Sequence, residues 1–312
     1  MKRLDLLAVS DMCVDLLLSG NVRPRFGQVE QLIGAYHLEL GGSANIFAAQ
    51  MAKLGAQAGV IGALGADPLG TFALGRLQSL GLDTGRVWVD ARLQTGLGVA
   101  LIEGNDRAIL TFPGSLSAVG PDRLPDLASE PCRHWHIASY FLLDRLRSVW
   151  RAWLAACRRA GITTSLDPNW DPENRWRGVR ELLPEVDVFL PNRAEILAIA
   201  GGTDPRMAAL ELSAAGPLVV VKCGADGVLA AWRGQVWEAP PLPLQSPVVD
   251  AVGAGDNFDA GFLCGRLSGW SVPNAIALGQ RCAVASLASS GGFAGQLEEP
   301  SFRPAGVCWK TP

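Results

Sequence analysis

The stretch Asp250-Ala-Val-Gly-Ala-Gly-Asp-Asn-Phe-Asp-Ala-Gly-Phe-Leu263 carries the most informative pattern in this chain of 312 residues. Three small residues, Gly253, Ala254 and Gly255, run directly into an apolar helical segment, and small residues let a backbone approach a ligand closely. The first turn of a helix leaves N–H groups unpaired, and the helix dipole favours an anion there. Asp256 faces the same position. Taken alone, an Asp here is more often an N-cap than a catalytic group.

Outward from this stretch, short apolar runs that end at Gly, Pro or Asp alternate with helical periodicities. We predict buried strands at residues 4–9, 58–62, 135–138, 163–166, 186–190 and 218–222. We predict helices at residues 45–54, 70–80, 145–160, 193–200, 207–214, 257–267 and 274–288. This alternation predicts an α/β fold with a mostly parallel sheet that is covered by helices on both faces.

Two stretches break the alternation. Residues 15–40 show no clear helix, and residues 87–111 hold two alternating runs, 97–103 and 107–111, around the turn sequence Gly104-Asn105-Asp106. We expect a single domain of residues 1–312, with a small β-lid formed by about residues 12–40 and 87–114. A plain edge hairpin is the alternative for the second stretch.

Polar residues follow several of the predicted strands. Parallel strands place ligands at their carboxyl ends, so we expect Asp11 and Asp15, after the first strand, to lie beside Asn45 at the start of the first helix. These three polar side chains are suited to hydrogen-bonding the hydroxyl groups of a ligand. Further polar groups after later strands are Asp167, Asn169, Asn192, Glu195 and Lys222, followed by Gly224 and Gly227.

Composition narrows the choice of function. The formal net charge is −3, and the basic residues are scattered, so nothing indicates a nucleic-acid surface. Seven cysteines without a CxxC pair predict reduced thiols and a cytoplasmic protein. The N-terminal segment is interrupted by Asp5, Asp11 and Asp15, so it reads as neither a signal peptide nor a membrane span.

Several other sites are weak or excluded. No Gly-Lys-Ser/Thr sequence occurs, which excludes a P-loop NTPase. Gly253-Ala-Gly255 continues into Asp and Asn without the third glycine of the dinucleotide-binding fingerprint, so a Rossmann dinucleotide site is a weak alternative. His134 and His136 alternate along an apolar strand, where ordinary strand histidines are the better interpretation than a metal pair because no third ligand is near.

Taken in order, these motifs resemble the ribokinase-like (PfkB) carbohydrate kinase family over about residues 4–295. The resemblance implies a three-layer α/β/α fold with a β-lid, ATP and Mg²⁺ as cofactors, and a sugar or related polyol as the acceptor. Asp256 is then the general base that deprotonates an acceptor hydroxyl, and Gly253, Ala254 and Gly255 form an anion hole. By the same resemblance the substrate is bound by Asp11, Asp15, Gly41, Gly42, Asn45 and Asn169.

The resemblance also implies a nucleotide site. Its residues are Asn192, Glu195, Lys222, Gly224, Gly227 and Asn274. Asn192 and Glu195 are expected to reach Mg²⁺ through water, and Asp250 is a candidate for a monovalent cation such as K⁺.

Departures from the family pattern leave alternatives open. Ala251 and Val252 stand where the family often has two threonines, and Arg193 replaces a common acidic residue. The stretch of residues 169–176 does not show the spacing of ketodeoxygluconate kinases and fructokinases. A nucleoside kinase and a non-catalytic sugar- or nucleoside-binding protein therefore remain alternatives. An exposed lid edge can also pair with its twin, so we expect a homodimer joined through the lids.

Overall fold

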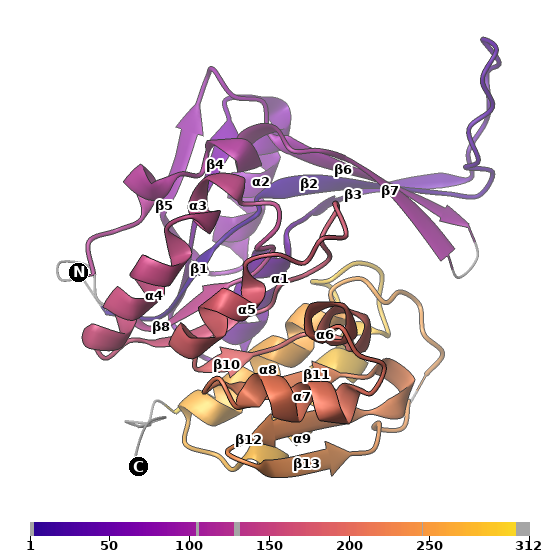
Figure 1. The fold of residues 1–312 in the computed structure, drawn as a ribbon. Helices are drawn as coiled ribbons and strands as arrows, with labels where there is room; N and C mark the ends of the chain where they lie inside the picture. Colours follow the sequence, from indigo (N-terminus) through magenta and orange to yellow (C-terminus); the bar gives the residue numbers. More distant parts are fainter. Residues whose placement is uncertain (1–2, 104–105, 128–131, 245, 304–312) are drawn as a thin grey trace.

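A mostly parallel sheet forms the centre of the molecule (Figure 1). Within residues 3–103, 106–127, 132–244 and 246–303, which the computed structural model describes, it has nine strands. In spatial order they are β13 (Gln235–Ala239), β12 (Val228–Trp232), β11 (Leu218–Lys222), β10 (Val188–Phe189), β9 (Thr163–Leu166), β8 (Cys132–Ile137), β1 (Leu4–Val9), β4 (Ala58–Gly65) and β5 (Asp83–Asp90). Only β12 runs antiparallel to its neighbours in this sheet. The predicted strands are confirmed, and the hairpin of β12 and β13 was not predicted.

Helices cover both faces of this sheet. One face carries α1 (Ser43–Lys53), α2 (Pro68–Ser79), α8 (Ala254–Leu267) and α9 (Val272–Ser286). The other carries α3 (Asp144–Arg147), α4 (Trp150–Arg159), α5 (Val179–Leu182), α6 (Arg193–Ala200) and α7 (Pro205–Ser213). Short 3₁₀ turns lie at Gly114–Ala118, Pro121–Arg123, Leu183–Glu185 and Gly224–Asp226. Strand β11 explains the layering: Leu218 and Val220 enter one core, and Val219 and Val221 enter the other.

A second, smaller sheet projects from the first and forms the lid (Figure 1). Its order is β3 (Ala35–Leu40), β2 (Cys13–Ser19), β6 (Gly96–Glu103) and β7 (Asp106–Phe112). Strands β2 and β6 pair in parallel, and the two outer pairs are antiparallel. The expected lid is present, but its second segment begins at Gly96, because residues 87–90 belong to β5 and pair with β4. Gly104 and Asn105 of the expected turn lie outside the described residues.

The strands that matter for function are neighbours. Strands β11, β10, β9, β8 and β1 are adjacent and mutually parallel, so their carboxyl ends lie at one edge of the sheet. The chain delivers one polar residue at or just after each end: Lys222, Asn192, Asp167, Ser139 and Asp11. Helices α1 and α8 approach the same edge, which is where a ligand of a parallel sheet is expected.

Two findings bear on the environment of the chain. The cysteines in the described residues are free thiols, and Cys308 lies outside those residues. None of the helices that the structure describes is both long enough and apolar enough to cross a membrane. A cytoplasmic location stays a prediction.

Candidate active site

Asp256 lies in the first turn of α8, directly beside the expected anion hole. The N-cap of this helix is Gly253, which has no side chain, so Asp256 is not its cap. Gly253 has a φ of 73°, and a Cβ there would come within 2.8 Å of the Gly292 Cα, which is why the position requires glycine. The N–H groups of the first turn have no partner within the helix, as an anion site requires, although the Ala254 N–H donates to the Ala251 carbonyl (3.4 Å). The cap interpretation of Asp256 is therefore wrong, and a role beside an anion is the better one.

The surroundings of Asp256 disfavour its charge. Burial raises the pKa of Asp256 well above its usual range, and the carboxylates of Asp167 and Asp11 act in the same direction. The Lys222 ammonium and the Ser43 hydroxyl oppose this rise in pKa. A carboxyl group with a raised pKa is a stronger base once it is deprotonated, as general-base catalysis requires.

Asp11 holds the start of α1. Its carboxylate accepts hydrogen bonds from the backbone N–H groups of Ser43 (3.2 Å) and Ala44 (3.3 Å). It also accepts a 2.5 Å hydrogen bond from the Ser139 hydroxyl. Burial raises the pKa of Asp11, while these hydrogen bonds lower it. The two oxygens of Asp11 thus accept three hydrogen bonds from the protein, and its role as a substrate ligand stays a prediction.

Asn45 has a similar supporting role. Its amide donates to the Gly41 carbonyl (2.8 Å) and accepts from the Ser10 hydroxyl (2.7 Å), deep in the core. These contacts hold the turn at Gly42, where φ is 95° and a Cβ would lie 2.7 Å from the Asp11 carbonyl oxygen. These contacts shape the turn, and the substrate contacts expected of Asn45 and Gly42 stay predictions.

Asp15 projects from lid strand β2 toward the turn before α1. A Cβ added to Gly41 would come within 2.7 Å of Asp15 Oδ2, and one added to Gly98 of β6 would meet Oδ1. The carboxylate therefore lies against glycine backbone, half-buried where the lid joins the main sheet. The Cys13 thiol lies 3.8 Å from Asp15 Oδ1, and the role of Asp15 as a substrate ligand on the lid side stays a prediction.

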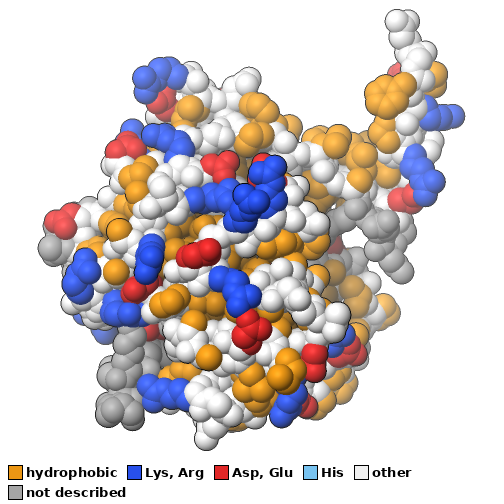
Figure 2. All heavy atoms as spheres, viewed as in Figure 1, with side chains coloured by type: hydrophobic (Ala, Val, Ile, Leu, Met, Phe, Trp, Pro, Cys, Tyr) orange, Lys and Arg blue, Asp and Glu red, His pale blue; other side chains and the backbone are white. Residues whose placement is uncertain are grey.

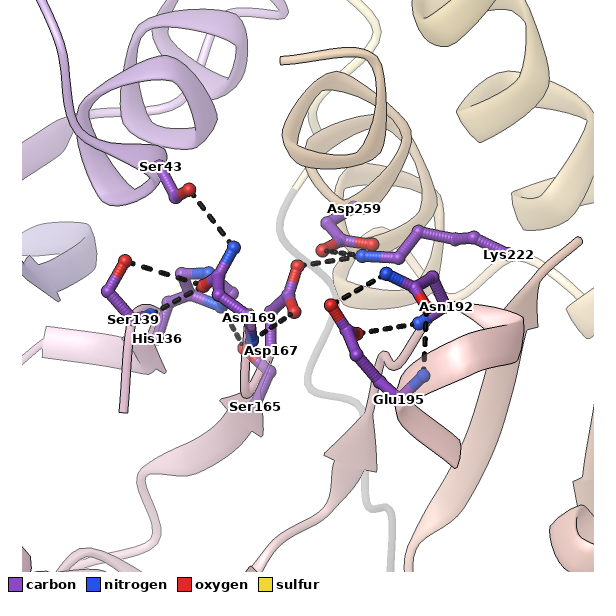
Figure 3. A network of polar contacts seen from close by, with 10 residues as sticks. All are labelled: Ser43, His136, Ser139, Ser165, Asp167, Asn169, Asn192, Glu195, Lys222 and Asp259. Atoms are coloured by element: carbon purple, nitrogen blue, oxygen red, sulfur yellow. Dashed lines mark hydrogen bonds and ion pairs between the residues drawn. The ribbon is translucent and has the colours of Figure 1, made fainter. Parts of the chain in front are cut away.

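Asn169 connects the loop after β9 to α1 and to the loop after β8 (Figure 3). Its amide nitrogen donates to the Ser43 hydroxyl (3.0 Å), and its amide oxygen accepts from the Ser139 N–H (2.5 Å). Both Asn169 and Ser139 have positive φ, at 53° and 51°, which is uncommon outside glycine and marks functional sites. Asn169 was predicted, whereas Ser139 was not, because nothing in its local sequence marks it.

Lys222 forms ion pairs with two buried carboxylates (Figure 3). Its Nζ lies 2.7 Å from Asp167 Oδ2 and 2.9 Å from Asp259 Oδ2. Burial alone would lower the pKa of Lys222, but the carboxylates of Asp167, Asp259 and Glu195 raise it above its ordinary value. Lys222 was expected to bind nucleotide phosphate; in this structure its ammonium pairs with protein carboxylates, and the phosphate contact stays a prediction. Asp167 and Asp259 were part of the quoted motifs but were given no role.

Asn192 and Glu195 form a capping box at the start of α6. Glu195 accepts from the Asn192 backbone N–H (2.8 Å) and from its amide nitrogen (2.6 Å), one bond to each carboxylate oxygen. Burial, with Asp167 nearby, raises the pKa of Glu195 to about 7. Because both oxygens are already bonded, these residues fit Mg²⁺ only through water, and that contact stays a prediction. Mg²⁺ in phosphoryl transfer typically keeps several waters and binds substrate phosphates.

A cavity of about 520 Å³ opens beside the first turn of α8. Its walls include Lys222, Gly224, Gly227 and Val228 from β11–β12, Leu242, Leu244 and Val248 from the loop after β13, Ala254, Gly255 and Phe258 from α8, and Gln280, Ala283, Val284 and Leu287 from α9 and its C-cap. Apolar walls suit a flat base, and unpaired N–H groups at the rim suit phosphates, so an adenine nucleotide fits. Gly224 and Gly227 line this cavity, whereas Asn274 is not among its lining residues, since α9 contributes residues from Gln280 onward. The nucleotide contacts expected of all three stay predictions.

Asp250 links two loops near the anion hole. One carboxylate oxygen accepts from the Val252 N–H and the other from the Gly291 N–H, each at 2.9 Å. The described residues contain no group of three His, Cys, Asp or Glu side chains that could hold a metal ion. A K⁺ ion at Asp250 stays a prediction.

The two strand histidines are part of the core. His134 shares hydrogen bonds with Thr163 (2.8 Å) and Ser165 (2.7 Å), and His136 shares one with Ser165 (2.7 Å). Burial lowers the pKa of His136 to about 3 and that of His134 well below its usual range, so both rings are neutral at physiological pH.

Comparisons with known proteins agree with this geometry. Residues 5–299 match the model of the family described as "pfkB family carbohydrate kinase". It is 31% identical to a fructokinase of Klebsiella pneumoniae, covering 91% of this chain and 93% of that protein. It is 30% identical to fructoselysine 6-kinase of Escherichia coli, covering 92% and 99%. An Escherichia coli structure determined with ATP and Mg²⁺ has the same fold, with a TM-score of 0.82 at 20% identity over 95% of this chain and 96% of that one.

Proposed function

The chain belongs to the pfkB family of carbohydrate kinases, and from that premise we propose that it transfers the γ-phosphoryl group of ATP to a hydroxymethyl group of a sugar, with Asp256 as general base. One observation supports this proposal above the others. A buried carboxyl group, Asp256, lies in the first turn of a helix whose N-terminal N–H groups border a cavity of nucleotide size.

Each site residue has a separate role in the proposed phosphoryl transfer. Asp256 accepts the proton of the attacking hydroxyl, and the backbone N–H groups of Gly253, Ala254 and Gly255 stabilise the negative charge of the phosphoryl group in transit. ATP supplies that phosphoryl group when it is bound. Asp15 orients the sugar from the lid side, while Asn169 holds the Ser43 and Ser139 loops around it. Closure of the lid over the strand ends excludes water, which would otherwise compete as the acceptor.

We further propose that two copies of this chain pair through their lids. Figure 2 shows hydrophobic side chains along the segment that projects between β2 and β3. There Phe26 is 95% exposed and Leu32 is 82% exposed, and Tyr36 on edge strand β3 and Leu110 on edge strand β7 are exposed as well. Exposed apolar side chains beside open strand edges support an interface.

An acceptor screen tests the proposed reaction. ADP formation is measured with hexoses, pentoses, keto-acids and nucleosides at fixed ATP and Mg²⁺. Fructose and its derivatives come first, because two relatives are named for them. We expect turnover with a sugar that carries a free hydroxymethyl group. Turnover with nucleosides alone, or with no acceptor at all, would overturn the proposal.

A further inference from the structure

Lys222 connects three parts of the site that lie on different elements. Through Asp167 it reaches the loop after β9, and through Asp259 it reaches α8 (Figure 3). A Cβ placed on Gly255 would lie 3.6 Å from Lys222 Nζ and 3.8 Å from its Cδ, so the side chain runs along the first turn of α8. The same side chain lines the cavity beside that turn.

The contact to Asp167 continues to the sugar side of the site. The other oxygen of Asp167 accepts a hydrogen bond from the Asn169 N–H (3.1 Å), and the Asn169 amide donates to the Ser43 hydroxyl (3.0 Å). A hydrogen-bonded chain thus runs from the wall of the nucleotide cavity to the start of α1. We propose that Lys222 is a positioning residue for phosphoryl transfer, not a phosphate ligand, and that Asp167, Lys222 and Asp259 form a neutral unit in which Asp259 carries a proton.

Charge and burial determine where the proton lies. One ammonium cannot balance two buried carboxylates, and an uncompensated buried charge is strongly unfavourable. Asp167 has the better donors, because the Asn169 N–H and Lys222 both bond it. Asp259 Oδ1 is buried and has no hydrogen-bond partner in the part of the chain that the structure describes. Because Asp259 has fewer hydrogen-bond donors than Asp167, ionising Asp259 would cost more free energy, so the proton is expected on Asp259.

The directions of the pKa shifts agree with this assignment. Burial raises the pKa of Asp259 well above its usual range, with Lys222 opposing and Asp167 adding to the rise. Burial would also raise the pKa of Asp167, but Lys222 and several hydrogen bonds bring it below its usual value. Because the pair shares one ammonium, the proton belongs to the unit as a whole and is held mainly on Asp259.

Lys222→Met is the first test, and it rests on the proposed kinase activity. If Lys222 positions the site, kcat falls at least about tenfold while KM for ATP changes less than about twofold. The acid limb of kcat/KM also moves to higher pH, because the Lys222 ammonium lowers the pKa of Asp256 against the burial and the carboxylates of Asp167 and Asp11 that raise it, with the Ser43 hydroxyl unchanged. Lys53→Met is the matched control, since Lys53 pairs with the exposed Glu298 and donates to the Phe293 carbonyl, away from this unit. A large rise in KM for ATP with unchanged kcat would overturn the proposal and restore Lys222 as a phosphate ligand.

The double variant Lys222→Met/Asp167→Asn removes the ammonium and the carboxylate that it balances. Lys222→Met alone leaves a buried carboxylate without its counter-charge, so its melting temperature at pH 8 should be lower than that of the double variant. A double variant less stable than Lys222→Met would contradict the neutral unit.

The isosteric pair Asp259→Asn and Asp167→Asn tests where the proton lies. Asp259→Asn keeps the Asp167–Lys222 ion pair, whereas Asp167→Asn forces Asp259 to ionise where its Oδ1 has no donor. We therefore expect Asp167→Asn to lower both the melting temperature and kcat more than Asp259→Asn does. The reverse order would refute the assignment. If the wild-type protein turns over no acceptor, the proposed function fails, while the melting temperatures still decide the charge state of the unit.

Discussion

At the scale of single residues, Asp256 is proposed to act as a base, but it lies in a buried site that disfavours its ionised form. In the proposed reaction Asp256 must be ionised to accept a proton, yet burial and the neighbouring carboxylates of Asp167 and Asp11 hold its pKa well above the usual range. We expect kcat/KM to fall as the pH falls, along an acid limb that lies above about 3.9, the pKa of an ordinary Asp. A pH–rate profile from pH 4 to pH 9 measures this limb. A rate that stays constant down to pH 4 would show that no group with a raised pKa is needed.

The same raised pKa predicts a gain in stability on neutralisation. A group whose folded-state pKa is raised lowers the stability of the protein as the pH rises from its unfolded pKa, about 3.9, toward its folded pKa. Asp256→Asn removes this loss, so the variant should unfold at a higher temperature than the wild type at pH 7 and at nearly the same temperature at pH 4. Thermal unfolding at the two pH values checks the sign. Equal melting temperatures at pH 7 would mean that the burial of Asp256 carries no penalty.

At the scale of elements, the conformation of Gly253 sets the direction of the first N–H groups of α8. Gly253→Ala places a Cβ at a φ of 73° and 2.8 Å from the Gly292 Cα, so the first turn must shift. We expect kcat to fall at least about tenfold, because small displacements of aligned groups are costly to catalysis. Gly75→Ala in α2 is the control, since its Cβ would meet nothing within 4 Å and its φ is not positive. Equal activity of the two variants would exclude Gly253 from the anion hole.

The strand–helix pattern predicted the central sheet well, and its failures have physical causes. The run of β11, Leu218–Lys222, was predicted with its bounds because a continuous apolar run is typical of a buried parallel strand. The hairpin of β12 and β13 was missed: its turn uses Arg233 and Gly234, both at positive φ, in place of a more recognisable Asn-Gly or Asp-Gly pair. The lid was expected, but its second segment was drawn to include part of β5, which has the same alternation.

The sequence predicted which residues gather at one edge of the sheet, but it did not predict their hydrogen-bond partners. Parallel topology alone brings Asp11, Asn169, Asn192 and Lys222 to one edge, so the sequence could place them together. It could not tell which side chains stay open to ligand, because that depends on three-dimensional partners. Asp11 and Lys222 are occupied by protein groups that lie 128 and 55 residues away. The three-residue spacing of Asp256 and Asp259 could have indicated that both carboxyl groups lie on the same face of the predicted helix, since residues three apart are neighbours on a helix.

At the scale of the whole molecule, the proposed pairing of two chains rests on the lid sheet and the segment that projects from it. Light scattering should give a mass near twice the monomer value of 33.0 kDa. Phe26→Ser with Leu32→Ser removes the most exposed apolar side chains of the projecting segment and should shift the protein toward the monomer. A wild-type mass that stays at the monomer value across working concentrations would exclude the dimer.

The central claim is that Asp256 accepts the proton of a sugar hydroxyl during phosphoryl transfer from ATP. Turnover of Asp256→Asn with the best sugar from the screen, beside that of the wild type, tests it most directly, because Asn keeps the shape of the side chain and removes the proton acceptor. General-base catalysis typically contributes 10²–10⁴-fold, so we predict that kcat falls by at least about 100-fold. ATP affinity, measured by titration, should be equal or slightly tighter, since a charge that repels phosphate is gone. A variant that keeps more than about a tenth of wild-type turnover would contradict the assignment.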